Sequence, residues 1–190
     1  MTGTPPDMAE IVQDANFLAH RYIEDDDQFR FLAVDREMHR NASFLTDEVL
    51  PGNLPVYDYP RQKVAAATPA AEKMHFIFHS AYCCSTMLAR AFDIEGFSMG
   101  LKEPVILNDM VGWKRRGAQP RDVAEVLDQS MNLLGRPFVS NEAIIVKPSN
   151  IVNSLAVAML AIKPNSHAVL LHAPLKTYLG SIAKKDMWGR

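Results

Sequence analysis

The residues that best fit a binding or catalytic role form one stretch, HSAYCCST, from His79 to Thr86. The apolar run Met74 to Phe78 before it is typical of a buried strand, and Ser85 to Phe92 is typical of the first turns of a helix. A loop between a strand and a helix turns backbone N–H groups and the positive end of the helix towards one point. This arrangement favours an anion, and a phosphate or phosphosulfate group is its natural ligand.

Two familiar phosphate chemistries fit this loop poorly. A Walker-type loop needs GxxxxGK[ST], but no glycine lies between Lys73 and Gly96, and no lysine stands directly before Ser85. Cys84 and Arg90 have the C-x5-R spacing of cysteine phosphatases, in which a thiolate at a helix N-terminus attacks phosphate. The five residues between them are helix formers rather than a glycine-rich cradle, so the phosphatase interpretation stays open as the less favoured alternative.

The spacing of apolar residues after Lys73 predicts the strands and helices that position this loop. Apolar runs of strand length alternate with helical stretches, which predicts an α/β fold whose parallel sheet is flanked by helices. We expect strands at 74–78, 97–101, 143–146 and 168–171, and helices at 85–92, 120–134, 150–162 and 175–185. Right-handed crossovers place the loops after the strands at one edge, where ligands bind. The segments AYCCST, KEP, KPSN and HAPLK should therefore meet in one cleft.

That cleft is expected to hold a carboxylate and a cation beside the anion loop. Glu103 directly follows the second predicted strand, and His79, Lys102 and Lys147 lie at predicted strand ends. Lys147 is the favoured cation because KPSN follows its strand without a break. Ser149 and Asn150 are interpreted as the cap of the next helix.

The first third of the chain is predicted to be a helical appendage. Asp7 and Glu10 have the spacing of a capping box, and apolar residues recur at helical spacing from Met8 to Tyr22. Asp25 to Asp27 is interpreted as a solvated turn, Phe29 to Val34 fits either a helix or a strand, and Arg36 to Leu45 is predicted helical with His39 on the surface. Prolines between Pro51 and Ala71 predict a connector. The expected division is 1–70, appendage and connector, and 71–190, α/β core.

The pattern strand, loop, Ser-Thr, apolar helix resembles the P-loop sulfotransferases, which use 3′-phosphoadenylyl sulfate. Their phosphosulfate loop reads roughly Lys/Arg-Ser-Gly-Ser/Thr-Thr, and the matching positions are Tyr82, Cys83, Cys84, Ser85 and Thr86. The resemblance covers about Met74 to Lys185. It implies a fold like that of the P-loop nucleoside-triphosphate hydrolases, a nucleotide co-substrate, no metal, and a small-molecule or other hydroxyl acceptor.

The resemblance also implies roles for residues outside the loop. Glu103 in LKEP matches the base that takes the acceptor proton, and Leu171-His172-Ala173-Pro174 with Ser181 matches the segment that contacts the 3′-phosphate.

The chain departs from the family pattern at several of these positions. Tyr82 replaces the loop cation, Cys84 replaces the loop glycine, and His172 replaces an arginine. Ser181 comes one residue later than usual, and the closing glycine-rich segment is missing. Lys147 would then have to supply the missing charge. A non-catalytic nucleotide-binding or interaction module of the same fold remains the alternative.

The composition limits the class of protein and the partners that we expect. The chain has 190 residues, of which 48% are hydrophobic and 22% charged, as in an ordinary globular protein. Its net charge of -2 supplies no basic field for nucleic acid or an anionic membrane. The only cysteines are adjacent, and the N-terminus MTGTPPDMAE lacks the basic and apolar regions of a signal peptide, so a cytoplasmic location is expected. No closing strand follows the last predicted helix, so the core is expected to be incomplete at its C-terminus.

Overall fold

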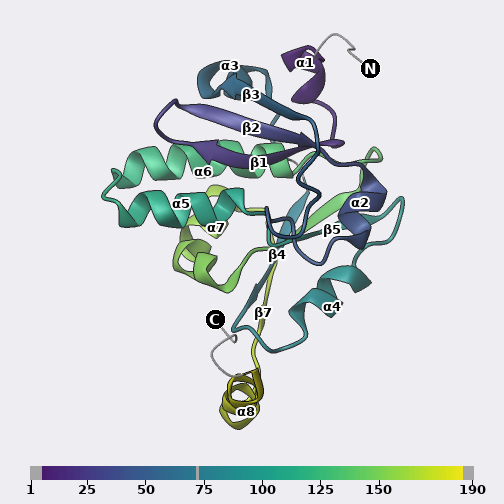
Figure 1. Ribbon diagram of the computed structural model, residues 1–190, viewed down its shortest axis with the longest axis vertical. Helices are drawn as coiled ribbons and strands as arrows, with labels where there is room; N and C mark the ends of the chain where they lie inside the picture. Colours follow the sequence, from purple (N-terminus) through teal and green to yellow (C-terminus); the bar gives the residue numbers. More distant parts are fainter. Residues whose placement is uncertain (1–5, 72, 186–190) are drawn as a thin grey trace.

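The computed structural model describes residues 6–71 and 73–185 and contains two β-sheets (Figure 1). One is antiparallel, with the order β1-β2-β3, formed by β1 (Phe17–Ile23), β2 (Gln28–Ala33) and β3 (Val56–Pro60). The other is parallel, with the order β5-β6-β4-β7, formed by β4 (Met74–His79), β5 (Ser98–Lys102), β6 (Ala143–Lys147) and β7 (Ala168–Leu171). The four predicted strands are therefore confirmed to within one residue at each end.

Helices cover the parallel sheet on both faces, which confirms the predicted α/β architecture. Helix α4 (Ser85–Ala91) contacts β4, β5 and β6 on one face, where Ile77, Ala89 and Ile145 form a small apolar cluster. On the other face lie α5 (Ile106–Arg115), α6 (Pro120–Leu134) and α7 (Ala156–Ile162) (Figure 1). A short 3-10 helix, η1 (Asn150–Leu155), precedes α7, so the helix predicted at 150–162 is α-helical only in its second half.

The order of the strands creates a switch in direction at β4. From β4 the chain runs through α4 to β5, returns through α5 and α6 to β6, and then passes through η1 and α7 to β7 on the far side of β4. The connections that leave the neighbouring strands β4 and β6 therefore run over opposite faces of the sheet. In open α/β sheets such a point leaves a crevice at the carboxyl ends of the strands.

The predicted N-terminal helix from Met8 to Tyr22 is wrong. Helix α1 (Met8–Ile11) is short, and β1 follows from Phe17. The register of β1 against β2 shifts between Ala19 and Arg21, which leaves His20 as the extra residue of a β-bulge. A bulge breaks the period-2 alternation of a strand, so the buried positions along β1 imitate helical spacing.

The remaining expectations for the first 70 residues need similar correction. Helix α2 spans Arg36–Asn41 only, and the expected connector contains β3 and helix α3 (Arg61–Ala67). His39, predicted on the surface, is 2% exposed and packs edge-on against the ring of Phe138. The aspartate turn is confirmed as the turn of the β1–β2 hairpin. The division of the chain at residue 70 stays a prediction.

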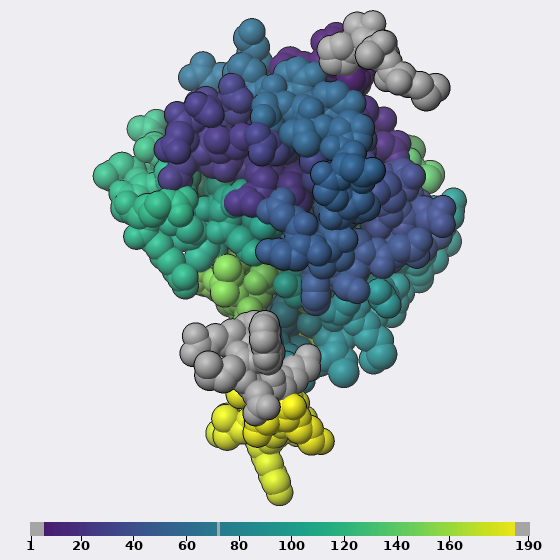
Figure 2. Space-filling model, in the orientation of Figure 1, coloured from purple at the N-terminus to yellow at the C-terminus, as the bar shows by residue number. Residues whose placement is uncertain are grey.

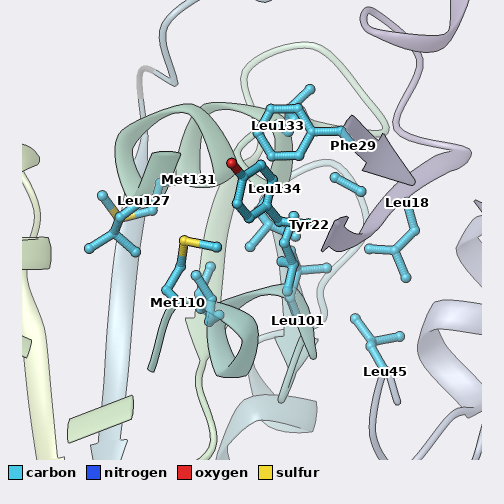
Figure 3. Close-up of a cluster of buried hydrophobic side chains, with 14 of the residues drawn as sticks. Leu18, Tyr22, Phe29, Leu45, Leu101, Met110, Leu127, Met131, Leu133 and Leu134 are labelled. Atoms are coloured by element: carbon cyan, nitrogen blue, oxygen red, sulfur yellow. The ribbon is translucent and has the colours of Figure 1, made fainter. Parts of the chain in front are cut away.

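The antiparallel sheet shares its hydrophobic core with the α/β elements. Figure 3 shows Leu18, Tyr22 and Phe29 of β1 and β2 packed among side chains of β5, α5 and α6. The cluster continues through Met110, Leu127, Met131, Leu133 and Leu134. Burial of these side chains is the main source of stability that links the two sheets.

Three arginines, of which Arg136 is buried, add polar connections across this junction. Arg21 of β1 donates to both carboxylate oxygens of Asp109 on α5. Arg36 of α2 donates to Glu142, whose side chain is fully buried and also accepts the N–H groups of Gly96 and Val139. Arg136, which follows α6, donates to four carbonyl oxygens, those of Leu133, Ile11, Asp14 and Phe17.

The last described helix, α8 (Leu175–Lys185), projects from the body of the protein (Figures 1 and 2). Leu175 and Leu179 are exposed, whereas the ring of Tyr178 lies edge-on to Tyr82 at a centroid distance of 5.8 Å. The prediction that the core is incomplete at its C-terminus concerns the chain after α8. Residues 186–190 lie outside the described residues. None of the described helices is long and apolar enough to cross a bilayer.

Candidate functional site

The edge of the sheet formed by the carboxyl ends of β4, β5 and β6, which we call the crevice, contains a charged pair. The Lys147 Nζ donates to Oε1 of Glu103, and the Glu103 N–H donates to the Lys147 carbonyl oxygen at 2.7 Å, continuing the ladder between β5 and β6. Glu103 has a φ of 52°, an unusual conformation for a residue other than glycine. This left-handed turn ends the strand and brings the carboxylate back towards β6.

The two members of the pair differ in their access to water. The side chain of Lys147 is 1% exposed and that of Glu103 is 21% exposed. Burial lowers the pKa of Lys147, while the hydrogen bond and charge of Glu103 act to raise it. The ammonium also lies 5.2 Å from the centre of the Phe44 ring, which covers it from the loop after α2. A buried cation is thus held by one carboxylate and one aromatic face.

His79, the last residue of β4, adjoins this pair. Its Nε2 is 3.8 Å from Oε1 of Glu103 and 3.0 Å from the carbonyl oxygen of Pro148, while its Nδ1 accepts the Ala81 N–H at 3.0 Å. Since Nδ1 accepts, the ring proton is on Nε2 and is donated to Pro148. Burial and the charge of Lys147 lower the pKa of His79.

The loop from Ser80 to Cys84 forms the second wall of the crevice. Ala81, Tyr82 and Cys84 have φ values of 66°, 50° and 62°, so three non-glycine residues adopt a left-handed conformation. The Ser80 N–H and the Cys83 thiol both donate to the Leu171 carbonyl oxygen of β7. Such a compact backbone curl before a helix is the kind of concavity that binds anions.

The residues predicted for the anion loop differ in exposure. Cys84 is exposed, Tyr82, Cys83 and Thr86 are half-buried, and Ser85 is buried at 5% exposed. The structure therefore brings the loop, Glu103 and Lys147 to one edge of the sheet, as the order of the strands predicted.

His172 and Ser181 lie on the other side of β4. His172 is exposed directly after β7, and the Ser181 hydroxyl donates to the Thr177 carbonyl oxygen within α8 at 2.9 Å. Glu103 and Lys147 come from β5 and β6, which are separated from β7 by β4. The role expected for His172 and Ser181 at a 3′-phosphate stays a prediction.

Comparisons with known proteins do not assign this chain to a family. No family model, curated protein or solved structure matches this chain. The function of this chain is therefore inferred from the geometry of the crevice and from the residues that line it.

Lys102, a candidate cation on its position at a predicted strand end, does not belong to the crevice. Its Nζ donates to the carbonyl oxygens of His39 and Arg40 at the end of α2, at 2.7 and 2.9 Å. Burial, with a smaller effect of Arg90, lowers its pKa to about 8. Lys102 is thus a structural residue that binds the free carbonyl groups of a helix C-terminus.

Two features of the crevice were missed in the sequence. Phe44 was predicted to be the penultimate residue of a helix, yet it lies in the irregular segment after α2. The contact of His79 with Pro148 depends on the order of β4 and β6 in the sheet, which no local pattern reveals. No local signal distinguishes Phe44, which lies between Ser43 and Leu45.

The geometry of Arg90 argues against the phosphatase interpretation. Arg90 lies in the last turn of α4, and Cys84 is the N-cap of the same helix. Six residues of α-helix correspond to about 9 Å along the axis. The guanidinium of Arg90 therefore belongs to the far end of α4, away from an anion at Cys84.

A cavity of about 670 Å³ lies at the opposite, amino edge of the sheet. It is lined by residues that include Lys73, Asn132, Arg136, Asn141 and Glu142. The buried charges of Arg136 and Glu142 already have protein partners. Among the described residues that line the cavity, no buried charged side chain is left without a protein partner, so the cavity is a weaker candidate than the crevice.

Proposed function

We propose that the crevice binds 3′-phosphoadenylyl sulfate and transfers its sulfuryl group to a hydroxyl acceptor, in a core like that of the P-loop nucleotide-binding proteins. The observation that supports the proposal is the Glu103–Lys147 ion pair beside a left-handed loop at the switch point of the sheet. A base and a cation are the two charged groups that sulfuryl transfer requires next to an anion-binding loop.

Each of these charges has a definite task in the reaction. The acceptor oxygen forms a bond to sulfur while its proton passes to the Glu103 carboxylate. The bond between sulfur and the bridging oxygen of the donor breaks, and adenosine 3′,5′-bisphosphate leaves with the electron pair. Lys147 stabilises the negative charge that develops on the bridging oxygen, in the manner of cations in phosphoryl transfer.

The loop supplies the third requirement, which is the position of the donor. Backbone N–H groups between Tyr82 and Ser85, with the hydroxyls of Ser85 and Thr86, would hold the 5′-phosphosulfate. Ser85 is buried in the unliganded protein, so binding through its hydroxyl requires a small movement of the loop. Cys83 and Cys84 contribute backbone groups only in this proposal.

The first test is binding of adenosine 3′,5′-bisphosphate, measured as a shift in thermal unfolding. A ligand present at 100 times its Kd stabilises the native state by about 2.7 kcal/mol. We expect Thr86→Ala to reduce the shift and Ser166→Ala, at the amino edge of the sheet, to leave it unchanged. Absence of any shift in the unmodified protein would contradict the proposal.

A second test separates an enzyme from a binding module. The protein is incubated with 3′-phosphoadenylyl sulfate carrying labelled sulfur and a panel of hydroxyl compounds. We expect label on at least one acceptor, and we expect Glu103→Gln to abolish transfer while nucleotide binding persists. Binding without transfer to any compound would favour the non-catalytic module.

A further inference from the structure

The side chain of His79 joins the two walls of the crevice. Its Nδ1 accepts the N–H of Ala81 from the loop after β4, and its Nε2 donates to the carbonyl oxygen of Pro148 from the segment after β6. The His79 carbonyl oxygen in turn accepts Nδ2 of Asn153 on η1 at 2.9 Å. One residue therefore fixes the distance between the two loops that separate at the switch point.

The bond to Ala81 exists only while the imidazole is neutral. A second proton would be added to Nδ1, which would then point a donor at the donor N–H of Ala81. Ala81 has a φ of 66°, a left-handed conformation that is unfavourable for an alanine. Loss of its hydrogen bond removes a contact that holds the loop in this strained form.

The charges around the ring come from the two neighbouring strands. Glu103, after β5, favours the protonated ring, and Lys147, at the end of β6, disfavours it. Cys83 lies in the β4–α4 loop and interacts electrostatically with Lys147. Burial has a larger effect than any of these groups and lowers the pKa of His79 below the ordinary value for histidine, so the ring is neutral at pH 7.

We propose that His79 is a positioning residue, which holds the Ser80–Cys84 loop closed in its neutral form and releases the loop when the ring is protonated. The crevice is then closed and competent for an anion near neutral pH and opens in acid. The connection between this motion and ligand binding rests on the proposed function, but the motion itself does not.

The thiol of Cys83 reports on the loop directly. It is half-buried and donates to the Leu171 carbonyl oxygen, and Cys84→Ser leaves it as the single cysteine of the chain. The reporter protein is labelled with 4,4′-dithiodipyridine, which reacts with thiols in acid as well as at neutral pH. The reference carries Cys84→Ser and His79→Asn, because asparagine can accept the Ala81 N–H without titrating.

The quantity compared is the ratio of the two labelling rates at each pH, which cancels the ionisation of the thiol. Between about pH 7.5 and about pH 5 we expect the ratio of reporter to reference to rise about tenfold, the effect of losing one hydrogen bond. A ratio that stays constant over this range would overturn the proposal.

A measurement on the unmodified chain covers the case in which His79→Asn fails to fold. Hydrogen exchange at the Ala81 amide, expressed as a protection factor at each pH, should fall about tenfold between neutral pH and about pH 5. An unchanged protection factor would overturn the proposal.

Titration with adenosine 3′,5′-bisphosphate then distinguishes this inference from the proposed function. We expect its affinity to decrease in acid for the unmodified chain and not for His79→Asn. If Cys83 labelling titrates while the nucleotide binds at no pH, the role of His79 stands and the proposed function fails. If the nucleotide binds while labelling does not titrate, the proposed function stands and the role of His79 fails.

Discussion

Lys147 and Glu103 share an ion pair in which one partner is almost wholly buried and the other is partly open to water. A charge that loses its partner in the interior is costly, whereas a partly exposed carboxylate can be solvated. Removing Glu103 and removing Lys147 should therefore change the stability by different amounts, and each residue can be tested separately.

Glu103→Ala should destabilise the protein more than Lys147→Met does. The first leaves an ammonium that is 1% exposed without its carboxylate, at a cost of about 3 kcal/mol. The double variant should cost less than the sum of the single variants by about 1–3 kcal/mol. Urea unfolding at neutral pH measures all four proteins, and additive effects would show that the pair is not coupled.

Arg136→Met should be among the most destabilising single changes in the chain. The guanidinium is buried and donates to four carbonyl oxygens, which would all lose a donor. The expected loss is about 3–5 kcal/mol in the free energy of unfolding. Arg136→Lys keeps the charge but has a single nitrogen, so its loss should be intermediate. A Met variant as stable as the parent would refute this view of Arg136.

His39→Phe should flatten the pH dependence of stability. Burial, the largest cause, lowers the pKa of His39 to about 3, whereas the unfolded chain binds the proton near pH 6.5. Between these values only the unfolded state is protonated, so acid removes up to ~1.4 kcal/mol of stability per pH unit. Unfolding curves at several pH values should show a smaller loss for His39→Phe below pH 6.5. A constant difference from the parent across the whole pH range would contradict this.

Gly100→Ala should disrupt the contact between β5 and α4. A Cβ at this position would overlap the carbonyl oxygen of Ala89, and backbone cannot move aside as a side chain can. We expect a loss of roughly 1–3 kcal/mol or more, measured by thermal unfolding. Gly52→Ala is the matched control, because no atom lies within 4 Å of its added Cβ. Equal effects at the two positions would rule out this steric explanation.

The parallel sheet could be predicted because its strands are apolar throughout and are separated by helices. Ile144 and Ile145, which face opposite sides of β6, are both buried, so the run has no polar face. A helix is wrongly predicted from Met8 to Tyr22 because the bulge at His20 gives β1 a helical pattern of burial. That pattern depends on pairing with β2 and on packing against α5 and α6, which are tertiary effects.

The candidate site could be predicted in outline for a related reason. Strand ends and their polar residues are visible in the sequence, and topology places them at one edge, which led to Glu103 and Lys147. The direction of each side chain was not visible. Lys102 and Lys147 are paired in register at the ends of neighbouring strands, yet one binds the end of α2 and the other binds Glu103.

The contacts of Arg136 also constrain when the protein can complete its fold during synthesis. Ile11, whose carbonyl oxygen it binds, precedes Arg136 by 125 residues. The antiparallel sheet emerges from the ribosome long before α6. Leu18, Tyr22 and Phe29 therefore stay exposed to water until the helices that pack against them have been synthesised. This long separation predicts slow closure of the core and a period in which the nascent N-terminal third exposes apolar surface that is prone to aggregation.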